Sequence, residues 1–165
     1  MRRFGHPPDR LRRYRRRPGA YAIIARGDTL LLTEQDADAF ELQLPGGGID
    51  PGESPVRALH REVFEETGWS IAVDRRLGAY QRFTYMPEYD MWAHKICIIY
   101  LCRPARQIAE PPEADHRTVW MPARQAVFAL SNSGDRHMLA GALGLRTIPP
   151  VPPGFAPSGG WIRLD

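Results

Sequence analysis

The sequence has 165 residues, of which 43% are hydrophobic and 25% charged, and its formal net charge is +3. This length suffices for one compact domain with a real core, and no apolar run is long enough to span a bilayer. The basic start is not followed by the apolar stretch of a secretory signal, so a cytoplasmic location is expected.

The positive charge is concentrated at the N-terminus. Residues 1–17 contain eight arginines and one acid, Asp9, which gives this segment a charge of +7 and leaves −4 for the rest of the chain. We expect residues 1–18 to form a flexible, solvated extension. A nucleic-acid-binding arm is the alternative interpretation.

Three short strands are predicted next. Residues 21–25 and 29–33 are apolar runs joined by a turn over residues 26–28, which indicates a hairpin. Residues 34–39 are polar and predict a loop, and residues 40–44 alternate as a half-exposed strand does. The glycines after Pro45 predict the end of that strand.

The best-defined helix is predicted over residues 55–67. Ser54 is a typical N-cap, Pro55 suits the first helical position, and Gly68 suits the C-terminal stop. A buried stripe at helical spacing is expected from Val56, Leu59 and Val63.

The second half of the chain predicts further strands and two helices. Strands are expected over residues 71–84, 94–102 and 118–121, and helices from Pro122 and over residues 136–143. A domain over residues 19–147 would then precede a Pro/Gly-rich tail over residues 148–165. The fold class predicted by this order is α/β, a mixed β-sheet between α-helices.

Two cysteines, Cys97 and Cys102, lie in one apolar run. Positions five apart on a strand point to opposite faces, so a disulfide between them is not expected. Core packing in a reducing compartment is the preferred interpretation.

Three carboxylates crowd one side of the predicted helix. Glu62, Glu65 and Glu66 have the spacing i, i+3, i+4, at which like charges repel each other. Arg61 can offset part of this repulsion, and a divalent cation would offset more, since magnesium prefers oxygen ligands. A solvated acidic helix face is the alternative for such a cluster taken alone.

The surroundings of these carboxylates resemble a known motif. Gly47, five residues, Glu53, seven residues and then Arg61-Glu62-Val63-Phe64-Glu65-Glu66-Thr67-Gly68-Trp69 resemble the Nudix box, G-x5-E-x7-R-E-U-x-E-E-x-G-U, where U is a bulky aliphatic residue. The one departure is Trp69 at the last bulky position. The resemblance implies a Nudix fold and hydrolysis of a nucleoside diphosphate linked to another moiety.

The resemblance also implies roles for the residues of the box. Glu53 would support the metal-bound water or orient the helix, and Arg61 would hold the glutamates by ion pairing. The general base could be Glu65, or Glu113 or Asp115 outside the box. The ligands of Mg²⁺ or Mn²⁺ would be the side chains of Glu62, Glu65 and Glu66, with the carbonyl of Gly46 as a further ligand.

Substrate-binding residues must come from outside the box. Tyr85, Tyr89 and Trp92 could stack on a base, and Lys95, the only lysine, could meet a phosphate. Aromatic side chains packed in a core are the alternative. We therefore predict a small-molecule nucleotide substrate and no membrane partner. A nucleotide-sensing module without turnover and an RNA 5′-end pyrophosphohydrolase are the alternatives, and a homodimer is one option for the oligomeric state.

Overall fold

The computed structural model describes residues 1–36, 40–112 and 116–145. Its strands are β1 (Arg2–Phe4), β2 (Arg15–Arg26), β3 (Thr29–Asp36), β4 (Phe40–Gln43), β5 (Gly46–Gly48), β6 (Trp69–Met86), β7 (Met91–Gln107) and β8 (His116–Pro122). Its helices are α1 (Pro55–Thr67), α2 (Ala123–Ala129) and α3 (Ser133–Ala142), with a 3-10 turn η1 (Pro87–Tyr89) between β6 and β7.

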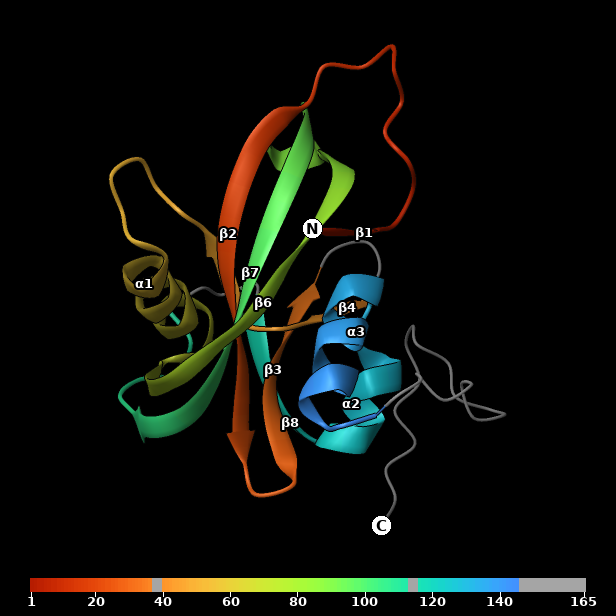
Figure 1. Ribbon diagram of the computed structural model, residues 1–165. Coiled ribbons are helices and arrows are strands. Elements are labelled where there is room, and N and C mark those ends of the chain that lie inside the picture. Colours follow the sequence, from red (N-terminus) through yellow and green to blue (C-terminus); the bar gives the residue numbers. More distant parts are fainter. Residues whose placement is uncertain (37–39, 113–115, 146–165) are drawn as a thin grey trace.

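A mixed sheet forms the centre of the molecule. The described strands run in the order β1-β6-β7-β2-β3-β4, and β5 and β8 pair with β2 and β3. Figure 1 shows α1 on one side of this sheet and α2 and α3 on the other. The predicted mixed sheet between helices is confirmed.

Strand β2 supplies both hydrophobic cores. Tyr21 and Ile23 pack in a cluster with α2 and α3, whereas Ala20, Ala22 and Ile24 pack in a second cluster with α1. Consecutive strand residues point to opposite faces, and both faces of this strand are covered. This explains the continuous apolar run at residues 20–24.

The β6–β7 hairpin is longer than the sequence predicted. Its two strands pair from Trp69 with Gln107 to Met86 with Met91. Cys97 and Cys102 lie in the two different core clusters as free, buried cysteines. The expectation that they do not pair is confirmed.

The N-terminal residues differ from the flexible extension expected over residues 1–18. β1 runs parallel to β6, and Phe4 packs edge-on against Tyr80 with ring centroids 5.5 Å apart. β2 begins at Arg15 and runs parallel to β7. The free edges of the long hairpin offer backbone partners that the charge pattern of the segment does not reveal.

Two smaller expectations were also wrong. β3 continues through Gln35 because it pairs with β4 on one side and β8 on the other, which overrides the polar sequence. Val56 is 41% exposed and does not belong to the buried stripe of α1. The strand before Pro45 ends at Gln43, as predicted, and the glycines after Pro45 form a separate strand, β5. The Pro/Gly-rich tail and the acids Glu113 and Asp115 lie outside the described residues.

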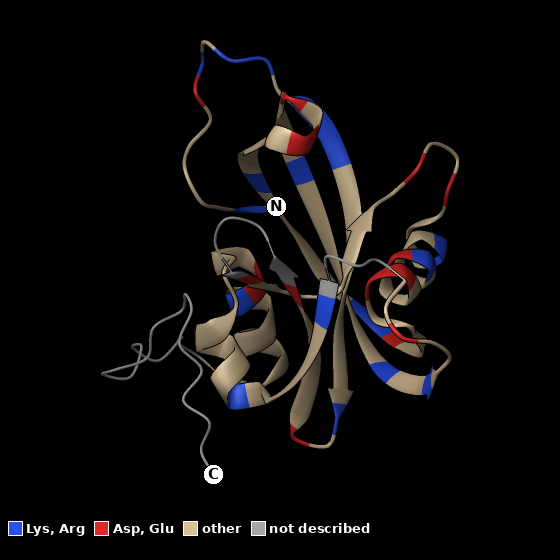
Figure 2. Cartoon of the chain, turned by 180° about the vertical axis from the view of Figure 1, so that it is seen from behind, with Lys and Arg blue, Asp and Glu red and all other residues tan. Residues whose placement is uncertain are grey.

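Charge is distributed unevenly over this fold. Figure 2 shows acidic residues on α1 and on the loop before it, and basic residues at the end of the sheet near the N-terminal segment. None of the helices in the described ranges has the length and apolar content needed to cross a membrane.

Candidate active site

Helix α1 has the predicted bounds because its ends are specified locally. The hydroxyl of Ser54 accepts a hydrogen bond from the backbone N–H of Arg57 at 3.3 Å, and Pro55 begins the helix. Gly68 ends it with φ 70°, and its N–H donates to the carbonyl of Phe64 at 2.8 Å. A left-handed residue at this position favours glycine.

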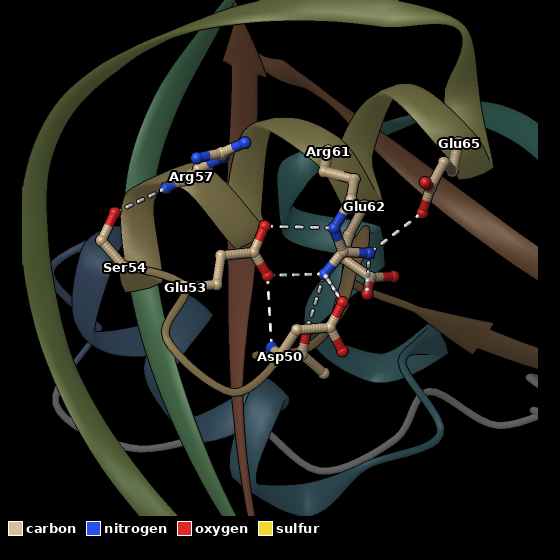
Figure 3. A network of polar contacts seen from close by, with 8 residues as sticks. Asp50, Glu53, Ser54, Arg57, Arg61, Glu62 and Glu65 are labelled. Atoms are coloured by element: carbon tan, nitrogen blue, oxygen red, sulfur yellow. Dashed lines mark hydrogen bonds and ion pairs between the residues drawn. The ribbon is translucent and has the colours of Figure 1, made fainter.

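Arg61 connects the carboxylates around α1 (Figure 3). Its Nε and Nη2 donate to the two carboxylate oxygens of Glu53 at 3.1 and 2.8 Å. Its Nη1 donates to Glu62 at 2.7 Å and to Glu65 at 3.2 Å. Nη2 also donates to the carbonyl of Gly48 at 3.0 Å. One guanidinium therefore binds the loop, the glycine strand β5 and the helix together.

These contacts set the protonation states of the pair. The hydrogen bonds from Arg61 hold the pKa of the Glu53 carboxyl below its ordinary value. The same bonds raise the pKa of Arg61. Both groups are therefore charged at neutral pH.

Glu66 is held by the glycine strand. Its Oε2 accepts a hydrogen bond from the backbone N–H of Gly46 at 2.9 Å, and the residue is only 9% exposed. At the neighbouring Gly47, an added Cβ would lie 2.2 Å from Oε2 of Glu62. Only glycine leaves room for the Glu62 carboxylate against this strand.

The donor set suits a hard cation, but in this conformation its oxygens have protein partners. In the described part of the chain, no group of three or more His, Cys, Asp or Glu side chains is arranged to hold a metal ion. Arg61 holds Glu62 and Glu65, and the N–H of Gly46 holds Glu66. Carboxylates and the carbonyl of Gly46 are nevertheless the oxygen ligands that Mg²⁺ and Mn²⁺ take in proteins.

Of the three candidate general bases, the structure describes Glu65. Glu65 is 38% exposed at its side chain and lies beside the other carboxylates. The two alternatives from the sequence, Glu113 and Asp115, fall outside the described residues.

Three of the four predicted substrate-binding residues lie on the sheet, where they are divided between its two faces, and the fourth, Tyr89, lies in η1. Lys95 is two residues from Cys97 and shares the face covered by α3, where it is paired with Arg82. Tyr85 and Trp92 pair with each other on the opposite face, with ring centroids 5.2 Å apart. One ligand lying on a single face does not contact all of them.

The environments of the aromatic residues also differ. Arg12 lies 3.7 Å from the ring centroid of Trp92, so this ring face contacts protein. Tyr89 is 57% exposed, and the Arg17 guanidinium lies 4.9 Å from its ring centroid. Tyr89 is therefore the more accessible ring.

Sequence reasoning missed two residues near Lys95. Lys95 on β7 lies between Arg17 on β2 and Arg82 on β6, and each of them pairs with it in register. The alternation of β6 could have indicated Arg82, because it lies two residues after the buried Tyr80. Nothing in the sequence could have placed Arg17 beside Lys95, since their pairing joins distant segments.

Comparisons with known proteins agree with this geometry. A family model described as "NUDIX domain" matches residues 15–141. The "Putative 8-oxo-dGTP diphosphatase" of Bacillus subtilis (strain 168) is 36% identical over 74 residues, which are 45% of this chain and 50% of that protein. The "RNA pyrophosphohydrolase" of Proteus mirabilis (strain HI4320) is 41% identical over 54 residues, 33% of this chain and 31% of that protein. The chain thus spans half or less of the length of these two relatives.

Solved structures show the same fold. The "NUDIX hydrolase from Nitrosomonas europaea" superposes with a TM-score of 0.65 at 20% sequence identity, covering 79% of this chain and 90% of that one. At this identity the likeness concerns the fold alone.

Proposed function

Because the chain belongs to the NUDIX family, we propose that it hydrolyses the diphosphate linkage of a nucleoside diphosphate derivative with the help of a divalent metal ion. The observation that carries this proposal is the cluster around Arg61. It brings Glu53, Glu62 and Glu65 together beside the glycine strand β5. Such a concentration of carboxylates has little structural use unless it binds a cation.

The metal ligands proposed are the carboxylates of Glu62, Glu65 and Glu66 and the carbonyl of Gly46. Members of this family generally use divalent metal ions, and Mg²⁺ or Mn²⁺ fits an all-oxygen donor set. When bound, such an ion neutralises phosphoryl charge and acidifies water.

The protein residues then have separate tasks. Arg61 keeps Glu62 and Glu65 on the same side of α1 through its hydrogen bonds of 2.7 and 3.2 Å. Glu53 fixes Arg61 through two further bonds and so acts as a positioning residue. Glu65 is the most exposed of the three glutamates that hydrogen-bond to Arg61, and it is our candidate to accept the proton of the attacking water.

The glycine strand supports the substrate side of the site. Gly46, Gly47 and Gly48 have no side chains to cover the backbone of β5, and this backbone passes from the buried Gly46 to the exposed Gly48. A phosphate can therefore approach closely, as side-chain-free backbone allows. Among the residues predicted from sequence, Tyr89 and Lys95 are our candidates for the nucleotide moiety, because Arg17 lies over the ring of Tyr89 and pairs in register with Lys95. Tyr85 and Trp92 lie on the other face of the sheet and contact each other.

The proposal is tested by incubating the protein with Mg²⁺ and a panel of nucleoside diphosphate derivatives. We expect release of a nucleoside monophosphate from at least one of them and loss of this activity in Glu66→Gln. An absence of hydrolysis over the whole panel, or undiminished activity in Glu66→Gln, contradicts the proposal. Tight binding without turnover would instead favour a nucleotide-sensing module.

A second candidate function is the removal of pyrophosphate from RNA 5′ ends. The name of the Proteus relative favours it, and so do the exposed arginines of the N-terminal segment. Deleting residues 1–17 is an unsuitable test, because it would remove the first residues of the central strand β2. Arg10 and Arg13 are exposed and lie outside the strands. If RNA is the substrate, Arg10→Gln with Arg13→Gln should weaken RNA turnover but not mononucleotide turnover.

A further inference from the structure

Three cations form a row across the sheet on the face that α3 covers. Arg17 of β2 pairs in register with Lys95 of β7, and Lys95 pairs in register with Arg82 of β6. Residues paired in this way point to the same side of a sheet. Two residues further along, Cys97 and Tyr80 occupy the same face in the core cluster.

These cations are not neutralised by ion pairs. Within the described residues, Arg17, Lys95 and Arg82 make no salt bridge and no side-chain hydrogen bond, and the Nε of Arg82 is buried without a partner. The buried carboxylate that acts on Arg82 and Lys95 is Asp135, which accepts its hydrogen bond from Tyr80 at 2.7 Å. All three residues are partly buried, and partly buried cations without hydrogen-bonded partners are costly, so a ligand is the natural source of compensation.

Burial and the charge of a neighbouring cation both affect the pKa of Lys95. Desolvation lowers the pKa of Lys95, and the charge of Arg82 lowers it further. An anion placed between the two side chains would relieve both effects. Lys95 otherwise has the ring of Tyr21 nearby, with Nζ 5.9 Å from the centroid.

The row begins on the other side of the glycine strand β5 from the proposed metal site. The Nη2 atom of Arg17 lies 3.9 Å from the point where a Cβ would stand at Gly48, and the carbonyl of Gly48 accepts a bond from Arg61. Neighbouring strands are about 4.8 Å apart, so the row extends about 10 Å from β2 to β6. This length exceeds that of a diphosphate group. The row also extends away from the carboxylates of α1.

We propose that the row of Arg17, Lys95 and Arg82 binds a second phosphate group of the substrate, separate from the diphosphate that is hydrolysed. The carboxylates of Glu88 and Asp135 act on Lys95. A phosphate monoester carries about −1.5 to −2 at neutral pH and offers three acceptor oxygens to the three cations, one more than a carboxylate offers. Arginine also binds phosphate through paired hydrogen bonds. This inference rests on the proposed function, because a diphosphate bound at the carboxylates of α1 would orient the rest of the substrate toward the row.

Ligand pairs that differ by one phosphate provide the test. NADPH differs from NADH, and coenzyme A from dephospho-coenzyme A, by a single ribose phosphate, and all four contain a diphosphate linkage. Their dissociation constants are measured by isothermal titration calorimetry in the presence of a chelator, so that turnover does not intervene. We expect the phosphorylated member of at least one pair to bind about tenfold tighter or more.

Variants of the row should remove this preference. In Arg82→Met and in Lys95→Met the ratio of the two dissociation constants should approach one, and circular dichroism should show that each variant is folded. Two variants are used because the Nε of Arg82 is buried, so that replacing Arg82 could disturb folding. The matched control is Arg106→Met, an exposed arginine on the same strand as Lys95, which should keep the wild-type ratio.

The outcomes separate this inference from the proposed function. Equal affinity within both pairs, failure of both phosphorylated ligands to bind, or an unchanged preference in a folded variant overturns the row as a phosphate site. Hydrolysis of unphosphorylated substrates with Mg²⁺ would still support the proposed function in each case. Conversely, a phosphate preference without any hydrolysis supports the row and contradicts the hydrolase.

Discussion

Arg61 and Glu53 meet through two hydrogen bonds, of 3.1 and 2.8 Å, that join the first half of α1 to the loop before it. Paired contacts of this kind fix the plane of the guanidinium as well as its position. The remaining nitrogen, Nη1, is thereby directed at Glu62 and Glu65. The arrangement of the acids on α1 depends on a residue that need not touch the substrate.

Arg61→Lys should reduce activity with little loss of stability. Lysine keeps the charge but cannot make the paired contact with Glu53 while also reaching Glu62. We expect kcat/KM to fall about 10- to 100-fold, as for other residues that support metal ligands. Arg57→Lys, one turn earlier and exposed, is the matched control and should stay within a factor of two or so of wild type. Equal activity of the two variants would contradict the role of Arg61.

Gly47→Ala should separate activity from folding. The added methyl would lie 2.2 Å from Oε2 of Glu62, and this carboxylate is the end of a flexible side chain that can move aside. We expect a fall in kcat of about 100-fold, because displaced catalytic groups cost this much, with a nearly unchanged melting temperature. Gly141→Ala has open space at its Cβ and should retain full activity.

Glu66→Gln should weaken metal binding more than it weakens the fold. The amide oxygen of glutamine can still accept the bond from Gly46, but the negative charge is lost. The Mg²⁺ concentration for half-maximal activity should rise about tenfold or more. Glu41→Gln removes an exposed charge on β4 and should leave the Mg²⁺ titration unchanged. A Glu66→Gln titration identical to wild type would exclude Glu66 as a ligand.

Tyr80→Phe should destabilise the protein by about 2–3 kcal/mol, because the buried carboxyl group of Asp135 loses its hydrogen bond. The phenol donates to Asp135 at 2.7 Å and accepts from Asn132 at 2.9 Å. Urea unfolding measures the loss. The exposed Tyr85 also donates to a carboxylate, that of Asp90, and Tyr85→Phe should change stability by about 0.5 kcal/mol or less.

The Tyr80→Phe loss should depend on pH. Burial raises the pKa of Asp135 in the folded state, so ionisation opposes folding above the ordinary value of 3.8. Without the phenol, the ionised form is stabilised less still. The difference between variant and wild type should therefore shrink as the pH falls toward 4 and be fully developed near neutrality. If the stability difference between Tyr80→Phe and wild type were constant over this pH range, the partner of the phenol would not be an ionising Asp135.

Both thiols should be unreactive in the native protein. Burial raises the pKa of Cys102 to about 12, and it also raises the pKa of Cys97. A thiol reagent that requires thiolate should label no cysteine at pH 8 in buffer and both in denaturant. Labelling of the native protein within the mixing time would contradict the packing of β7.

Features with short-range causes could be predicted from the sequence. The bounds of α1 follow from Ser54, Pro55 and Gly68, which lie within one turn of the ends that they specify. The acid cluster could be predicted for the same reason, since Arg61 and its partners Glu62 and Glu65 are neighbours on one helix.

Long-range pairing could not be predicted in this way. The polar residues at the end of β3 gave no sign of strands on both sides, and the arginines before β2 gave no sign of β7. The register of the β6–β7 hairpin decides that Arg82 lies beside Lys95. That register depends on where η1 turns the chain, which alternation alone does not reveal.

The parallel pairing of the N-terminal segment also constrains how the chain can be made. Arg2 pairs with Tyr80 and Arg15 with Ala93, so both partners are synthesised 78 residues later. At about 5–20 residues per second, the ribosome delivers them several seconds after the arginines emerge. During that interval β1 and residues 15–18 of β2 have no strand to join, whereas the rest of β2 can already pair with β3 and β5. We therefore expect the β6–β7 hairpin to assemble first and the N-terminal segment to dock onto its two edges afterwards.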